Sequence, residues 1–348
     1  MIINSAGSIA GNFEKVFSFD DVLLTPNYSD VESRQEINIG NNLGPHQLKL
    51  PIISSPMDTV TEETMVQTMA NYGGLGVIHR YNTIDDQQRM IEHLRREMDD
   101  VAVAVGVSGD FEHRASACVA SGATILCVDI AHGHHTLMER ALKTLKDAFG
   151  SHIHIMAGNV ATLEGFNDLA DWGADSIKVG IGGGSICSTR VQTGHGMPTL
   201  QSILECAKSD RDAKLVADGG IKTSGDITKA LAAGADFVML GSLLAGTDES
   251  PGDVYTSPKG SKYKVYRGMA SREAQIDWRG SVSSLEGIST TIPYKGSVKK
   301  IIKELVRGIK SGFSYSGART IEELHAKARF IEQTSAGQIE SSTHILRR

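Results

Sequence analysis

Eight short apolar segments, each followed by a helical pattern, constrain the fold more than any other feature of this 348-residue chain. Near-continuous apolar runs such as residues 101–107 and 124–130 fit parallel strands that are buried on both faces. Strands that alternate with helices along a chain form a parallel sheet. We therefore predict an α/β fold, a (β/α)8 TIM barrel, in one domain over residues 1–348. A doubly wound sheet is the alternative, but eight evenly spaced units suit closure better.

The predicted elements follow one another without long gaps. Strands are expected at residues 50–55, 74–79, 101–107, 124–130, 153–157, 176–179, 214–217 and 237–240. Helices are expected at residues 61–72, 85–98, 110–121, 136–149, 162–172, 198–209 and 224–234, with a closing helix at 297–310. Thr83 has the position of a helix N-cap. Residues 245–295 break the pattern, and residues 270–285 are polar without a clear period, so this excursion is predicted to lie over the barrel mouth as a lid.

A barrel of this kind carries its chemistry at the carboxyl ends of its strands. The run from Gly180 to Arg190 falls at such an end and contains four glycines followed by Cys187. Glycines let the backbone approach a ligand closely, and a thiol is a soft nucleophile. This combination indicates covalent catalysis on an anionic ligand. The loops at 218–220 and 241–242 follow strands seven and eight, where barrels often hold phosphate.

Several classes of protein are disfavoured. The net charge of −6 gives no reason to expect a nucleic-acid partner. No apolar run approaches the roughly 20 residues that cross a bilayer, and residues 1–14 do not resemble a secretory signal. Four cysteines do not form a disulfide framework in a chain of this length. Histidines at 132, 134 and 135 lack a matching distant ligand set for zinc. We expect a cytoplasmic protein that binds a small molecule and no membrane.

Several motifs resemble the IMP dehydrogenase/GMP reductase family, and the resemblance spans residues 17–329. They are FDDVLL at 19–24, SSPMDTVT at 54–61, KVGIGGGSICSTR at 178–190, DGG at 218–220, YRGM at 266–269 and IPYKG at 292–296. The chain lacks the CBS modules that dehydrogenases usually carry after strand two. Its short flap, the segment between Gly268 and Glu286, has Trp278-Arg279 where dehydrogenases use an Arg-Tyr pair. Arg267, in contrast, is more dehydrogenase-like. The loop at 129–134 is similar to that of some bacterial reductases.

The resemblance therefore favours the reductase branch, and it implies NADPH-dependent reductive deamination of GMP to IMP and ammonia in purine salvage. Cys187 would form a thioimidate with purine C2, and Thr189 and Glu286 would transfer protons. An IMP dehydrogenase without CBS modules is one alternative, and a non-catalytic nucleotide-binding barrel is another. Family members are commonly homotetramers.

The resemblance also implies the binding residues. The substrate would contact Ser55, Met57, Ser185, Asp218, Gly219, Gly220, Gly241, Ser242, Tyr266, Arg267, Gly268, Met269 and Ala270. The NADPH nicotinamide would lie against Asp129, Asn159, Gly180, Ile181 and Gly182. A monovalent cation such as K⁺ would bind the backbone carbonyls of Gly182, Gly184 and Cys187.

Overall fold

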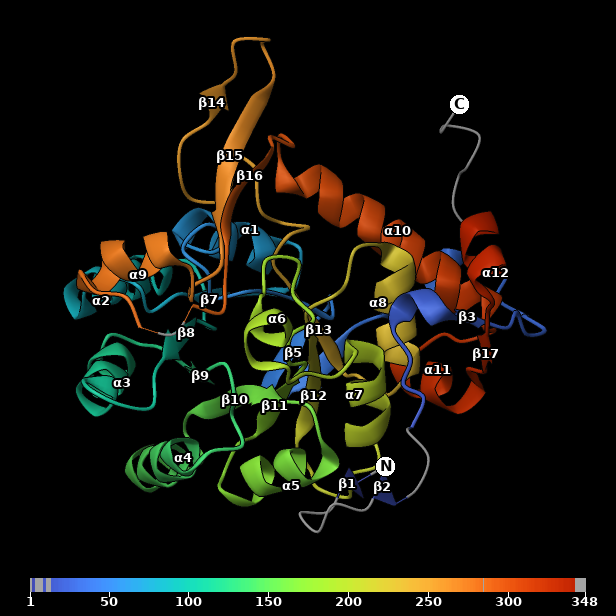
Figure 1. Cartoon of the computed structure of the whole chain (residues 1–348), viewed down its shortest axis with the longest axis horizontal. Coiled ribbons are helices and arrows are strands. Elements are labelled where there is room, and N and C mark those ends of the chain that lie inside the picture. Colours follow the sequence, from blue (N-terminus) through green and yellow to red (C-terminus); the bar gives the residue numbers. More distant parts are fainter. Residues whose placement is uncertain (1, 4–8, 11–13, 284, 342–348) are drawn as a thin grey trace.

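The computed structural model describes residues 2–3, 9–10, 14–283 and 285–341, and its centre is a closed barrel of parallel strands (Figure 1). The strands are β6 (Ile52–Ser54), β7 (Leu75–Ile78), β8 (Ala102–Val105), β9 (Ile125–Asp129), β10 (His154–Val160), β11 (Ser176–Val179), β12 (Lys214–Asp218) and β13 (Phe237–Leu240). They stand in chain order, and β13 pairs with β6 to close the ring. The predicted (β/α)8 barrel is confirmed, whereas a doubly wound sheet would have left two open edges.

Successive strand residues point alternately into the barrel and outward to the helices. On β8, Ala102 and Ala104 belong to the interior cluster, whereas Val103 and Val105 pack in the outer layer beneath the helices. Both sets are buried. This two-sided burial explains why the strands read as continuous apolar runs rather than as an alternating pattern.

Eight helices lie outside the strands, and each follows a strand in the chain. They are α1 (Glu63–Asn71), α2 (Ile84–Leu94), α3 (Phe111–Ala120), α4 (Thr136–Phe149), α5 (Leu163–Asp171), α7 (Thr199–Cys206), α8 (Ser224–Ala232) and α10 (Val298–Tyr315). The predicted N-cap is confirmed, since the Thr83 hydroxyl accepts the backbone N–H of Asp86 at 3.1 Å. The closing helix ends at Tyr315, beyond the predicted residue 310.

A hairpin absent from the sequence prediction closes the amino-terminal end of the barrel. Its strands are β4 (Asn41–Leu43) and β5 (His46–Leu48), and Leu43 and Leu48 belong to the interior cluster. At its edges Asn41 donates to Asp236, which precedes β13, at 3.1 Å. The hairpin therefore fills the lower opening with hydrophobic side chains and leaves the opposite end for ligands.

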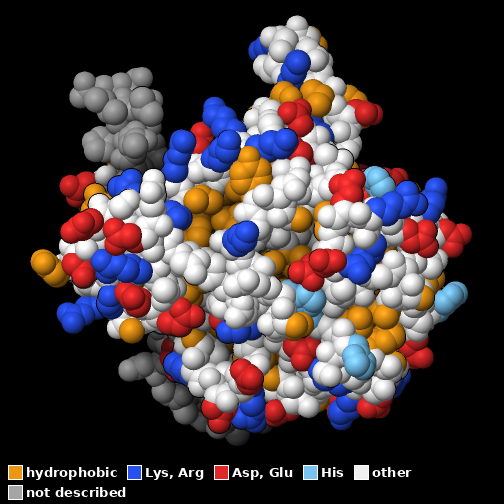
Figure 2. Space-filling view, turned by 180° about the vertical axis from the view of Figure 1, so that it is seen from behind, with side chains coloured by type: hydrophobic (Ala, Val, Ile, Leu, Met, Phe, Trp, Pro, Cys, Tyr) orange, Lys and Arg blue, Asp and Glu red, His pale blue; other side chains and the backbone are white. Residues whose placement is uncertain are grey.

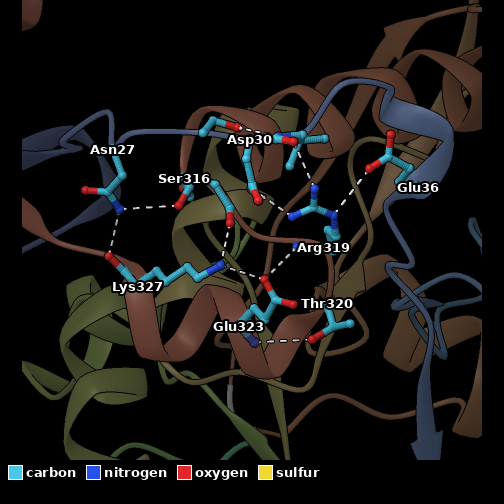
Figure 3. A network of polar contacts seen from close by, with 11 residues as sticks. Asn27, Asp30, Glu36, Ser316, Arg319, Thr320, Glu323 and Lys327 are labelled. Carbon is cyan, nitrogen blue, oxygen red and sulfur yellow. Dashed lines mark hydrogen bonds and ion pairs between the residues drawn. The ribbon is translucent and has the colours of Figure 1, made fainter.

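Other elements secure the two ends of the chain to each other. β3 (Val22–Leu24) pairs with β17 (Phe330–Glu332). Figure 3 shows Arg319, which precedes α11 (Ile321–Lys327), between two acidic residues of the amino-terminal segment. Its Nη1 lies 2.8 Å from Asp30 and its Nε lies 3.3 Å from Glu36. Two 3-10 turns, η1 (Phe19–Asp21) and η2 (Arg34–Glu36), and the short elements β1 (Ile2–Ile3), β2 (Ile9–Ala10) and α12 (Ser335–Glu340) complete these regions.

The excursion between β13 and α10 forms a projecting antiparallel arm and a helix (Figure 1). The arm consists of β14 (Tyr255–Thr256), β15 (Lys262–Arg267) and β16 (Ser289–Pro293), and the helix is α9 (Arg272–Arg279). The expectation that residues 270–285 lack a regular period was wrong for α9. Ser271 is the N-cap of α9, and its hydroxyl accepts the N–H of Ala274 at 3.3 Å. Serine is a preferred N-cap residue, so the sequence did contain a signal for the start of this helix.

Two sequence expectations concern membranes and targeting. Within the described part of the chain, no helix is both long and apolar enough to cross a bilayer. The expectation that residues 1–14 form no secretory signal falls mostly outside the described residues.

The hairpin predicts a large stability effect at one residue. Leu43 is fully buried, so Leu43→Ala should lower the free energy of unfolding by about 2–5 kcal/mol through lost burial and a residual cavity. Gln47→Ala, on the exposed side of the same hairpin, should change it by less than about 0.5 kcal/mol. Urea unfolding followed by circular dichroism measures both. Equal effects of the two substitutions would contradict a plugging role.

Candidate active site

A cavity of about 470 Å³ opens at the carboxyl ends of the strands. This volume lies in the range of roughly 300–1,000 Å³ typical of small-molecule sites. Every predicted site residue except Arg267 contributes to its lining. Because the carboxyl ends of all eight strands lie on one rim of the barrel, residues from distant parts of the chain meet in this cavity.

A thiol, a hydroxyl and a carboxylate lie in series on one wall of the cavity. The Cys187 thiol donates to Thr189 Oγ1 at 3.1 Å, and the Thr189 hydroxyl donates to Glu286 Oε2 at 2.9 Å. Thr189 begins the short helix α6 (Thr189–Thr193), and Glu286 comes from the flap after α9. Such a series can pass a proton between the carboxylate and a group bound at the sulfur.

Backbone pairing holds these distant segments together. The N–H of Ser188 donates to the carbonyl of Glu286 at 2.9 Å, and the N–H of Ile288 donates to the carbonyl of Ile186 at 3.0 Å. Cys187 and Gly287 form the antiparallel bridge between these bonds. Residues 186–188 and 286–288 are thus joined by antiparallel backbone pairing, which fixes Glu286 relative to Cys187.

The glycine loop lies directly against the end of β12. Gly180 has φ = +143°, and a Cβ at this residue would lie 2.0 Å from the carbonyl oxygen of Asp218. Only glycine permits both this backbone angle and this approach. The loop can therefore pass beside Asp218 and present Cys187 to the cavity.

Predicted substrate residues from three segments converge around Gly241. A Cβ at this glycine would meet Tyr266 Oη at 3.1 Å, Met57 Sδ at 3.3 Å and Ser55 Oγ at 3.6 Å. Tyr266 is buried, and burial raises the pKa of its phenol. The phenol therefore stays protonated at neutral pH and is available as a hydrogen-bond donor.

Lys178 was not predicted as a site residue, yet its ammonium group connects two predicted carboxylates. Its side chain is only 2% exposed, and Nζ is hydrogen-bonded to Asp129 and lies 3.8 Å from Asp218. Burial is the largest single influence and by itself would lower the pKa of Lys178, but the nearby negative charges, chiefly the Asp129 and Asp218 carboxylates, together outweigh it and the net shift is upward. Asn159 completes the network by donating to Asp218 at 2.9 Å and to the Gly180 carbonyl at 2.9 Å.

The flap is held over the cavity by an aromatic and cationic cluster. The Trp278 ring on α9 meets Tyr81 edge-on, with ring centroids 5.0 Å apart. The Arg80 guanidinium carbon lies 5.0 Å from the Tyr81 centroid and 5.4 Å from that of Trp278. All three residues line the cavity. The sequence analysis did not predict these three as site residues. Arg80 and Tyr81 could have been predicted, because they closely follow the carboxyl end of β7.

Arg267 is placed differently from the other predicted residues. Its guanidinium donates to Asp58 at 2.6 Å and to Asp277 of α9 at 2.5 Å, and it is not among the residues that line the cavity. The contacts give it a structural part in holding α9 to the loop after β6. A direct contact with substrate stays a prediction.

Cys187 differs from the other three cysteines in its surroundings. Cys187 is exposed, whereas Cys118, Cys127 and Cys206 are buried. Burial raises the pKa of each buried thiol to about 12. Because the thiolate is the reactive form, these three are inert at neutral pH.

A family model and individual relatives match nearly the whole chain. A model of the IMP dehydrogenase / GMP reductase domain matches residues 16–344. The chain is 34% identical to inosine-5'-monophosphate dehydrogenase of Nitrosopumilus maritimus, over 95% of this chain and 98% of the relative. It is 32% identical to GMP reductase of Leishmania major, over 94% of this chain and 96% of the relative.

A solved structure gives the same result. A cysteine-to-alanine variant of GMP reductase from Trypanosoma brucei, in complex with guanosine 5'-monophosphate, superposes with a TM-score of 0.91 at 31% identity, over 95% of this chain and 98% of that chain. The alignments to the Nitrosopumilus and Leishmania proteins run over 471 and 474 positions, more than the 348 residues of this chain. Both relatives therefore contain insertions, so the lack of inserted modules here does not separate dehydrogenase from reductase.

The cysteine environments predict selective alkylation. Iodoacetamide at neutral pH should modify Cys187 in the folded protein and leave Cys118, Cys127 and Cys206 intact, because these thiols are buried and protonated. Mass spectrometry of peptides from the treated protein identifies the modified residue. Cys187→Ala should remain unmodified, and modification of a buried cysteine at a similar rate would refute the assignment.

Proposed function

This chain belongs to the IMP dehydrogenase/GMP reductase family, and we propose that it is a GMP reductase, which converts GMP to IMP and ammonia with NADPH as the reductant. The observation that carries the proposal is the series Cys187–Thr189–Glu286 on the cavity wall. It provides a nucleophile together with a route for the proton that an amine leaving group requires.

The chemistry follows from the electronic character of the purine. C2 lies between two ring nitrogens and is electrophilic, so the Cys187 thiolate adds there and forms a carbon–sulfur bond. The bond from C2 to the exocyclic nitrogen then breaks, and the nitrogen leaves as ammonia after protonation through Thr189 and Glu286. A nicotinamide nucleotide held beside Asp129, Asn159 and residues 180–182 would supply the hydride that C2 receives. The carbon–sulfur bond breaks, IMP is released and the sulfur returns as thiolate.

The remaining cavity residues fit a purine nucleoside monophosphate. The hydroxyl groups of Ser185 and Ser242, with the backbone N–H groups of the glycine loops, suit the phosphate. Asp218 can accept from ribose hydroxyls, and Lys178 keeps a positive charge beside it. Ser55 and Met57, next to Gly241, would flank the base, and Met269 and Ala270 would meet its edge.

The neighbouring wall suits a nicotinamide nucleotide. Asp129, Asn159 and residues 180–182 line it together with Arg80. The Arg80 Nε is buried and has no hydrogen-bond partner among the described atoms. An unused donor that lines the same cavity as the Asp129 carboxylate fits a polar ligand with both acceptors and hydroxyl groups. The preference for NADPH, and a monovalent cation on the carbonyls of Gly182, Gly184 and Cys187, rest on the family resemblance.

IMP dehydrogenase is the second candidate, because Arg279 of the flap lines the same cavity as Cys187. That activity needs a group that activates water. Arg279, however, is hydrogen-bonded to Gln275, to Ser283 and to the carbonyl of Ser281 at 3.2 Å. Its Nε and Nη2 donors are thus engaged within the flap itself, which supports the reductase.

The absorbance of the reduced nicotinamide distinguishes these candidates. GMP with NADPH should lose absorbance, and IMP with NAD⁺ should show no gain. Cys187→Ala should lower turnover by at least about a thousandfold while GMP still binds in calorimetry, because the phosphate and ribose contacts remain. A gain with IMP and NAD⁺ would establish the dehydrogenase, and nucleotide binding without turnover would leave a non-catalytic barrel.

The proton-transfer role predicts a selective effect at Glu286. Glu286→Gln should slow ammonia release by about 10²–10⁴-fold, because the amide does not deliver a proton as the acid does. Hydride transfer, isolated by rapid mixing of IMP with NADP⁺, should change far less. Glu273→Gln, an exposed carboxylate on α9, is the matched control. Equal losses in both steps for Glu286→Gln would refute the role.

A further inference from the structure

A second cavity, of about 400 Å³, lies on the outside of the barrel between α10 and the end of α1. None of its lining residues belongs to the candidate active site. Its volume falls within the range of roughly 300–1,000 Å³ expected for a small-molecule site. Figure 2 looks at the back of the molecule, where Lys and Arg side chains border a hollow with hydrophobic side chains in its floor. We call this cavity the α10 groove.

The floor of the α10 groove is apolar, and its edge carries an aromatic ring. Ile37, Ile39 and Leu50 form the floor and are almost fully buried within the core. Tyr72, the C-cap residue of α1, is half-buried at the edge. An aromatic side chain that is exposed on one side beside an apolar floor can stack against a flat ring of a ligand.

The walls of the groove are cationic. Lys303, Arg307 and Lys310 are four and three residues apart on α10, a spacing that puts them on one helix face, and Lys49 stands opposite. Within the described part of the chain, none of these four has an acidic group within ion-pair distance, and no acidic residue lines the groove. The net charge of the protein is −6, yet these four cations gather around one cavity without an acidic partner among the described residues. A negatively charged ligand would therefore compensate their charge.

We propose that the α10 groove binds a phosphorylated aromatic metabolite of the nucleoside polyphosphate class. The phosphates would lie among Lys303, Arg307 and Lys310, where charge-assisted hydrogen bonds are available. The flat ring would stack on Tyr72 above the apolar floor. The groove thus supplies the three features that such a ligand needs, which are cations, an aromatic ring to stack on and a cavity of sufficient volume. The inference does not depend on the reaction proposed for the barrel mouth.

Titration with two probes of similar charge tests the proposal. ATP should bind at least about fivefold more tightly than inorganic tripolyphosphate, because base–aromatic stacking contributes about 1–3 kcal/mol. Tyr72→Leu should remove most of this difference. The double variant Lys303→Ala/Arg307→Ala should weaken ATP binding by at least about tenfold. Lys299→Ala/Lys300→Ala removes the same charge from exposed residues of α10 outside the groove and should leave affinity within about twofold.

Photolabelling locates the ligand. 8-azido-ATP should label a peptide that contains Tyr72 or residues 303–310 in the parent protein, and the Lys303→Ala/Arg307→Ala variant should lose that label. Labelling confined to residues 180–190 or 241–242 would place ATP in the barrel mouth and overturn the proposal. Equal affinities for ATP and tripolyphosphate, an equal loss in the two double variants, or no binding of either probe would overturn it as well. Urea unfolding of the variants confirms that their fold is intact.

Discussion

Closure of eight parallel strands into a ring is the constraint on which the other features of this structure depend. A closed ring encloses an interior that side chains must fill, and it places the carboxyl ends of all eight strands on one rim. Apolar side chains from Ala104 to Phe237 in size fill the interior, and Leu43 and Leu48 of the β4–β5 hairpin plug its lower opening. Of the two openings of the barrel, only the upper rim is left for ligands. Because the ring is closed, the barrel has no exposed sheet edge of its own.

The buried charge of Lys178 is compensated by neighbouring polar groups. Lys178 lies among apolar strands, and an unpaired ammonium there would be costly. Asp129 and Asp218 compensate its charge, and Asn159 ties Asp218 to the glycine loop. One buried cation thereby connects the wall proposed for the cofactor to the wall proposed for ribose. The charge compensation that Lys178 requires thus also holds in place two carboxylates that are proposed to bind ligands.

Whether a site residue could be predicted from the sequence depends on what positions it, which is either the end of a strand or a contact between distant segments. Residues directly after strands, such as Asp218 and Gly241, were predictable because strand order fixes the rim. Glu286 became a candidate only through family resemblance, since 97 residues separate it from Thr189. The contact of Trp278 with Tyr81 was missed, because no local pattern shows that α9 folds back onto the loop after β7. The α10 groove was missed for the same reason, as helix spacing alone does not reveal what faces Lys303.

The sequence by itself determined the eight strand–helix units, the closed barrel and the family, because these depend on local periodicity and on contiguous motifs. It also determined which loops meet at the rim. Only the tertiary structure decided that Cys187, Thr189 and Glu286 form one hydrogen-bonded series, and that Arg267 holds the flap helix rather than lining the cavity. The physical reason is that side-chain contacts across distant segments depend on backbone pairing and packing in three dimensions. Composition and periodicity carry no record of either.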